Sequence, residues 1–191
     1  MHLATLFFHL PFGLRRSRRR NRTAHANPPS FMNKKTLLRT LDAAVAAHKS
    51  GQHQEAERLY ALVRQGAPRL FDGWYLSGVL AVHADRPADA VPFLLQALQL
   101  DKNSAETRLF LGMALADLER YAEAVKPLRS ALEKLPEHPA AWENLAKSLA
   151  AVGRPAEADE CLRRVLAMQP HRADVREKPA AAATTPVALA S

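Results

Sequence analysis

The chain has 191 residues, of which 48% are hydrophobic and 24% charged, and its formal net charge is +8 at pH 7. Its single cysteine excludes an internal disulfide framework, and a chain of this length buries enough surface to fold without one. The abundance of alanine and leucine and the scarcity of β-branched residues favour helices over sheets.

The first segment, residues 1–35, carries the charge excess. It holds eight of the 27 lysines and arginines and no acidic residue, so the other 19 basic residues balance the 19 acidic ones. The basic pI therefore describes this segment and does not make the rest of the chain a nucleic-acid binder. We expect the segment to be disordered, and we expect nucleic acid to be contacted, if at all, only through Arg15–Arg22.

The same segment opens with the apolar run LATLFFHLPF. This run precedes the arginines, whereas the apolar run of a secretory signal follows its basic residues, and it is too short to span a bilayer. Two interpretations stay open: an organellar transit peptide, and translated sequence upstream of a true start at Met32. We expect no membrane span and a cytoplasmic protein.

From residue 37 onward the chain repeats itself with a period of 34 residues. Segments such as ADRPADAVPFLLQALQLDK at 84–102 and LERYAEAVKPLRSALEKLP at 118–136 share one pattern of small, large and polar residues. A fixed period of this length is typical of stacked helical repeats. The aligned small residues are Ala44, Gly78, Gly112 and Ala146, then Ala56, Ala90, Ala124 and Ala158; the aligned large residues are Tyr60, Leu94, Leu128 and Leu162.

Each repeat contains two helical patterns. In the last one these are AAWENLAKSLAAV and AEADECLRRVLAM, which Gly153 and Pro155 separate. We therefore predict an all-α protein in which residues 36–172 form four helix-turn-helix units, and 173–191 form a short incomplete helix and a flexible tail. The predicted units are 37–70, 71–104, 105–138 and 139–172.

These units resemble the tetratricopeptide repeat family, whose pattern is Trp-x2-Leu-Gly-x2-Tyr, then Ala-x3-Phe, then Pro. The fourth unit matches at Trp142, Leu145, Ala158 and Pro170, with Ala146 in the place of the glycine. The resemblance implies a right-handed superhelical solenoid of about four units. It also implies a non-enzymatic module that binds another protein or peptide.

In that family, the first helices of the repeats line a concave groove that holds the partner. Chaperone-binding members clamp a peptide carboxylate with Lys and Asn, and we do not expect that clamp, because the matching positions here are acidic, aromatic or aliphatic. The apolar middle of the groove has two open interpretations: an exposed patch that contacts the partner, or side chains that pack between adjacent repeats. The candidate groove residues are Asp42, Val45, Tyr75, Leu76, Val79, Phe110, Met113, Asn144 and Lys147.

Other candidate chemistry is weak. Cys161 lies beside two arginines, but it aligns with Leu59, Phe93 and Pro127, which predicts a buried small apolar residue and not a nucleophile. The sequence has no His or Cys cluster at metal-ligand spacing and no phosphate-binding loop. We therefore expect no catalytic residue, no metal, no cofactor and no small-molecule substrate.

The last repeat supports an alternative. It also resembles the repeats that precede the catalytic domain of O-linked N-acetylglucosamine transferases, where asparagines line the groove. Asn144 occupies the matching column here, whereas the other three repeats have different residues in it. The alternative is therefore a detached or truncated repeat arm of such a transferase, or of another multidomain transferase. Self-association through the open edge of the last repeat is also left open.

Overall fold

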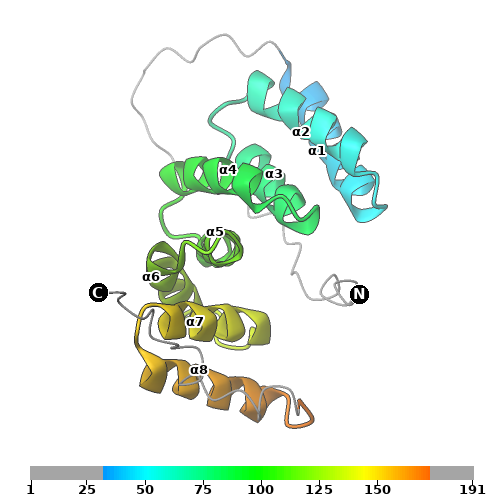
Figure 1. Ribbon diagram of the computed structural model, residues 1–191. Helices are drawn as coiled ribbons and strands as arrows, with labels where there is room; N and C mark the ends of the chain where they lie inside the picture. The colour runs from blue at the N-terminus through cyan, green and yellow to red at the C-terminus, as the bar shows by residue number, and fades with distance from the viewer. Residues whose placement is uncertain (1–31, 173–191) are drawn as a thin grey trace, which may run out of the picture.

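The computed structural model describes residues 32–172, and residues 1–31 and 173–191 lie outside the described part (Figure 1). Most of the expected basic segment and all of the expected C-terminal tail fall outside it. The described residues contain helices and no strand, which confirms the all-α prediction. The helices are α1 (Lys34–Lys49), α2 (His53–Gly66), α3 (Phe71–His83), α4 (Pro87–Leu100), α5 (Ala105–Asp117), α6 (Tyr121–Leu132), α7 (Pro139–Ala151) and α8 (Pro155–Met168).

The helices pair in chain order. The most extensive contacts are those of α1 with α2, α3 with α4, α5 with α6 and α7 with α8. The second helix of each pair then packs on the first helix of the next pair. Figure 1 shows the four pairs following one another along a curved stack. The chain therefore folds as the four helix-turn-helix units that its period predicts.

The first helices lie on the inner side of this curve. α3 contacts α5, and α5 contacts α7. The second helices α6 and α8 reach each other in a different way, through two long and exposed side chains, those of Arg129 and Glu157, which form an ion pair. Because elements on the inner side of a curved stack approach one another more closely than those on the outer side, α1, α3, α5 and α7 form the concave face.

The turn between the two helices has the same backbone in every repeat. Gly51, Asp85, Glu119 and Gly153 all have positive φ, between 56° and 77°, and they are spaced by the period of the sequence. The amide that follows each of them donates back to a carbonyl of the first helix, as Arg154 N does to Leu149 O at 2.8 Å. A left-handed residue with this hydrogen bond is a common way to end a helix.

The aligned small and large residues meet in the core. Ala56, Ala90, Ala124 and Ala158 are all fully buried. The large residues Tyr60, Leu94 and Leu128 are also fully buried, whereas Leu162 is only half-buried. Leu162 belongs to α8, beyond which the described part holds no further pair to cover it.

The first helix begins earlier than the sequence period suggests. Asn33 caps α1, and its Oδ1 accepts a hydrogen bond from Thr36 N at 2.8 Å. Lys34 and Lys35, which we expected in the disordered segment, therefore form the first turn of α1.

Candidate functional site

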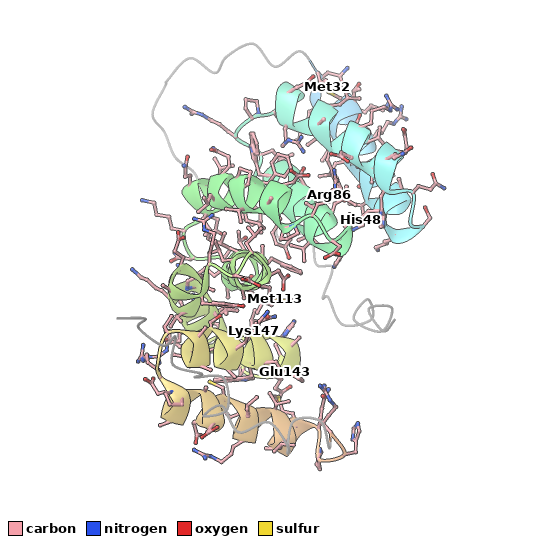
Figure 2. All side chains as sticks on the ribbon, in the orientation of Figure 1. Met32, His48, Arg86, Met113, Glu143 and Lys147 are labelled. Carbon is pink, nitrogen blue, oxygen red and sulfur yellow. The ribbon has the colours of Figure 1, made fainter. Side chains whose placement is uncertain are left out.

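The nine candidate groove residues all lie on the first helices, but they differ in exposure. In Figure 2, Met113 on α5 and Lys147 on α7 follow one another along the inner side of the stack. Asp42 and Lys147 are exposed; Val45, Tyr75, Leu76, Met113 and Asn144 are half-buried; Val79 and Phe110 are buried, with exposed fractions of 3% and 8%.

Phe110 is buried because aromatic rings of α3 cover it. Its ring centroid lies 6.1 Å from that of Tyr75 and 6.1 Å from that of His83, and Tyr75 in turn stacks on Phe71 at 5.4 Å. These rings join the second repeat to the third. Of the two interpretations open in the sequence, packing between repeats therefore describes Phe110, and Val79 is likewise too buried to belong to an exposed patch.

A second ring cluster joins the first two repeats. His48 Nε2 lies 3.1 Å from His83 Nδ1, and His48 Nδ1 lies 3.4 Å from Tyr60 Oη. Burial, followed by the nearby His83 and His53, lowers the pKa of His48 to about 4. The sequence did not reveal this cluster, because His48 and His83 are 35 residues apart and so do not share a column of the repeat.

Two carboxylates act electrostatically on the half-buried Tyr75. Burial first, then Glu106 and Asp72, raises the pKa of the Tyr75 phenol, so both acids lie close to it. Burial also raises the pKa of Asp72. Within residues 32–172, neither Asp72 nor Glu106 takes part in an ion pair. This part of the inner face therefore carries negative charge that the described chain does not neutralise.

The acids of the second helices are arranged differently. Glu55 pairs with Arg58, and Glu123 with Arg120, each at 2.7 Å. The Arg partner holds the pKa of each of these glutamates below its usual value. A cationic ligand is therefore attracted more strongly to the inner face, where Asp72 and Glu106 form no ion pair, than to the second helices, where Glu55 and Glu123 are paired with arginine.

The fourth repeat adds positive charge to the same face. Lys147 Nζ lies 5.4 Å from the Tyr121 ring centroid. Burial raises the pKa of Asp117, and the positive charge of Lys147 lowers it in part. Glu143 Oε1 accepts a hydrogen bond from Arg172 Nη1 at 3.1 Å. The charge of the inner face therefore changes from acidic in the middle to mixed at its C-terminal end.

Cys161 is a buried thiol, as predicted. It is 4% exposed, and burial raises its pKa to about 11, so the reactive thiolate is disfavoured. In the described part, no group of three or more His, Cys, Asp or Glu side chains is placed to hold a metal ion. No helix between residues 32 and 172 has the length and apolar character needed to cross a membrane.

Comparison with known proteins identifies the repeat. Two models of the tetratricopeptide repeat match residues 41–105 and 115–181. No curated protein matches the chain. Among solved structures, a crystal structure of MamA protein is 22% identical with a TM-score of 0.67, covering 72% of this chain and 75% of that one.

Two further solved structures give similar values. MamA from Desulfovibrio magneticus RS-1 is 16% identical with a TM-score of 0.67, covering 73% of this chain and 78% of that one. YrrB, described as a TPR protein with an unusual peptide-binding site, is 23% identical with a TM-score of 0.65, covering 75% of this chain and 74% of that one. At such identities the likeness concerns the fold.

Proposed function

The chain belongs to the tetratricopeptide repeat family, and from this premise we propose that it is a non-enzymatic module that holds a peptide or helix of a partner protein in its concave groove. The observation that carries the proposal is the inner face around Tyr75. The half-buried apolar side chains of Leu76 and Met113 belong to the first helices α3 and α5, as do the carboxylates of Asp72 and Glu106 that act on Tyr75.

The chemistry of this face specifies the partner segment. Apolar side chains with part of their surface exposed gain free energy when a partner covers them. Carboxylates that form no ion pair within residues 32–172 favour lysine or arginine on the ligand. The proposed ligand is therefore an amphipathic segment with apolar and basic residues. The same negative charge opposes binding of nucleic acid in the groove, since phosphates are anionic.

The experiment compares two double variants that remove equal charge. Asp72→Asn with Glu106→Gln alters the groove, and Glu55→Gln with Glu123→Gln alters the second helices. Candidate partners are enriched from the source cell with the full chain, and their binding segments are then titrated calorimetrically against each variant.

We expect the groove variant to bind a basic segment about 30-fold more weakly, because two lost charge pairs of about 1 kcal/mol each add up to about 2 kcal/mol. The control should keep the wild-type affinity. Equal loss in both variants would contradict the groove assignment. Circular dichroism and the unfolding midpoint verify that both variants fold.

A further inference from the structure

Residues 1–31 lie outside the described part of the structure, but the point at which they join it is defined. Met32 lies against Gly66 at the C-terminal end of α2, since a Cβ atom on Gly66 would fall 2.8 Å from Met32 Sδ. The short loop 67–70 leads from Gly66 to α3, and Asp72 belongs to the first turn of α3. The N-terminal segment therefore joins the fold close to the start of α3.

Two carboxylates of the groove lie at the starts of successive first helices. Asp72 and Glu106 occupy the same position of the second and third repeats, each in the first turn of its helix. Both act electrostatically on Tyr75, and neither forms an ion pair within residues 32–172. The starts of α3 and α5 therefore offer two negative charges to one cationic ligand.

Apolar side chains follow these acids along the same two helices. Leu76 comes four residues after Asp72, and residues at this spacing share one face of a helix. Met113 comes seven residues after Glu106, which also keeps it on the face of its acid. Both apolar side chains are half-buried. With increasing distance from the helix starts, the inner face therefore presents negative charge first and apolar surface second.

The N-terminal segment carries the complementary groups in the same order. Read backward from Met32, its sequence has six arginines within residues 15–22, and then the apolar run LATLFFHLPF at residues 3–12. It has no acidic residue. A segment that starts beside α3 and runs along the inner face therefore brings its arginines to the acids and its apolar run to the apolar surface.

The connecting residues 23–31 are long enough for this path. Nine residues span about 30 Å when extended, whereas packed helices lie about 10 Å apart. A short flexible tether also gives the segment an effective concentration on the order of 1 mM at the groove. A contact too weak to form between separate molecules is therefore populated within one chain.

We propose that residues 3–22 dock in the concave groove of their own chain, with arginines against Asp72 and Glu106 and the apolar run against Leu76 and Met113. This inference rests on the proposed function, because it uses the same groove, and it adds a means of regulation. A partner segment must displace the chain's own segment before it binds. A segment that is disordered when free can bind in this way, since contacts with the groove offset the cost of ordering it.

The first experiment maps the docking site with a photo-crosslinker in the full chain. Phe8→p-benzoylphenylalanine keeps an aromatic side chain in the apolar run, and irradiation joins it to the side chains that it touches. Peptide mass spectrometry should locate the crosslinks on α3 and α5. An isotope-labelled wild-type chain is mixed in, so that crosslinks between two copies are recognised. Crosslinks on the second helices alone, or only between copies, would overturn the proposal.

The second experiment measures competition for the groove. A fluorescein-labelled peptide with the sequence of residues 3–24 is titrated with the full chain and followed by fluorescence anisotropy. In one variant chain, the six arginines of residues 15–22 are replaced by glutamine, which releases the groove. All six substitutions lie outside residues 32–172, so the repeats keep their sequence.

We expect this six-arginine variant to bind the peptide about tenfold more tightly than the wild type. The reason is that a tether giving about 1 mM keeps the groove about tenfold more often occupied than open, for a peptide dissociation constant of about 100 µM. Two matched controls are made in the six-arginine variant. Asp72→Asn with Glu106→Gln should weaken peptide binding about 30-fold, and Glu55→Gln with Glu123→Gln should leave it unchanged.

Equal affinity of the wild type and the six-arginine variant for the peptide would overturn the proposal. So would the absence of peptide binding to the six-arginine variant at about 1 mM, because the tethered segment would then leave the groove open. Neither result contradicts the proposed function, which fails only when a partner segment binds the groove variant and its control equally.

Discussion

The side chain of Leu128 on α6 lies directly against the backbone of Gly112 on α5, so that a Cβ atom on Gly112 would fall 2.5 Å from Leu128 Cγ. Gly78 and Leu94 have the same relationship one repeat earlier. The two helices of these repeats therefore approach to a distance that only glycine permits. This contact is the physical reason for one column of small residues in the sequence.

Gly112→Ala should destabilise the protein by about 1–3 kcal/mol, because the added methyl group must displace a fully buried leucine and approaches the backbone amide of Leu128 as well. Gly66→Ala is the matched control. There the new methyl meets only the flexible end of Met32, so the cost should stay below about 1 kcal/mol. Urea unfolding measures both. Equal stability of Gly112→Ala and wild type would show that the helices are farther apart than described.

The left-handed turn residues give a second, purely backbone prediction. Glu119 has φ 59°, where an L side chain is strained, whereas Gly153 occupies the equivalent turn with φ 77°. A Cβ atom on Gly153 would meet nothing within 4 Å. Gly153→Ala should therefore cost about 1 kcal/mol from the backbone alone, and Glu119→Gly should be neutral or stabilising by up to about 1 kcal/mol.

Thermal unfolding of the two variants provides the measurement. Loss of stability in both would contradict the common turn geometry, because the two substitutions change the same backbone position in opposite directions.

The sequence predicts the stack well because one physical constraint recurs every repeat. Small residues such as Gly112 must face large ones such as Leu128, and this pattern is visible without coordinates. The left-handed turns at Asp85 and Glu119 were not predicted, since neither side chain marks such a backbone as glycine does. Register follows from periodicity, but individual backbone angles do not.

The candidate site was harder to predict for a different reason. Periodicity assigns Phe110 and Met113 to the same inner face, but it cannot say which of them a neighbour covers. Tyr75 and His83 bury Phe110, while Met113 keeps part of its surface exposed.

Acid should destabilise the fold through His48. Its pKa is lowered from 6.5 to about 4 in the folded chain, by burial and then by His83 and His53, so the unfolded chain binds a proton more readily. The contribution to stability is complete above about pH 6.5 and is lost as the pH falls toward 4. Its total is on the order of 3 kcal/mol.

Urea unfolding across this pH range tests the effect. His48→Gln should flatten part of the slope, although the variant starts less stable because it loses the contacts with Tyr60 and His83. His171→Gln, at an exposed position, is the control and should leave the slope unchanged. A slope that survives in His48→Gln would assign the acid sensitivity to other groups.

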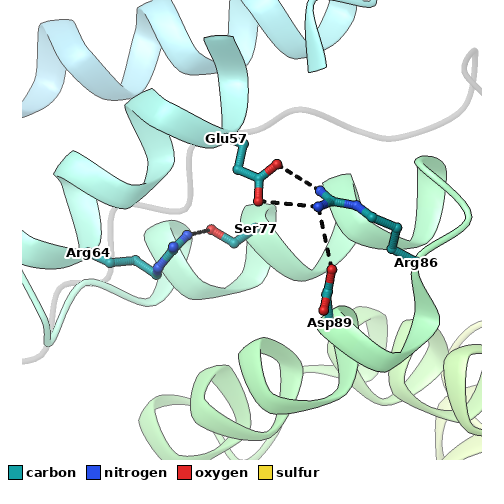
Figure 3. A network of polar contacts seen from close by, with 5 residues as sticks. All are labelled: Glu57, Arg64, Ser77, Arg86 and Asp89. Atoms are coloured by element: carbon teal, nitrogen blue, oxygen red, sulfur yellow. Dashed lines mark hydrogen bonds and ion pairs between the residues drawn. The ribbon is translucent and has the colours of Figure 1, made fainter. Parts of the chain in front are cut away.

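The contact between the first two repeats allows stacking and ion pairing to be compared (Figure 3). Arg64 is half-buried between Trp74 and Phe93, whereas Glu57 pairs with Arg86 at 2.8 Å with nearly half of its side chain exposed. Exposed ion pairs contribute little because water and salt screen them. Arg64 buries both its alkyl stem and its guanidinium against aromatic rings.

Glu57→Ala should therefore cost less than about 1 kcal/mol, also because Arg86 retains Asp89 as a partner. Arg64→Ala should cost about 1–3 kcal/mol, because it leaves the facing surfaces of Trp74 and Phe93 without a contact. Ser77 adds nothing to this cost, since its hydroxyl still donates to Gly73 O. Arg64→Leu introduces the residue found at this position in the other three repeats. Its destabilisation should lie between those of Glu57→Ala and Arg64→Ala, because leucine restores the packing but not the cation. Urea unfolding ranks the three variants, and a larger loss for Glu57→Ala than for Arg64→Ala would mean that ion pairs, and not stacking on Trp74, hold the first repeat to the second.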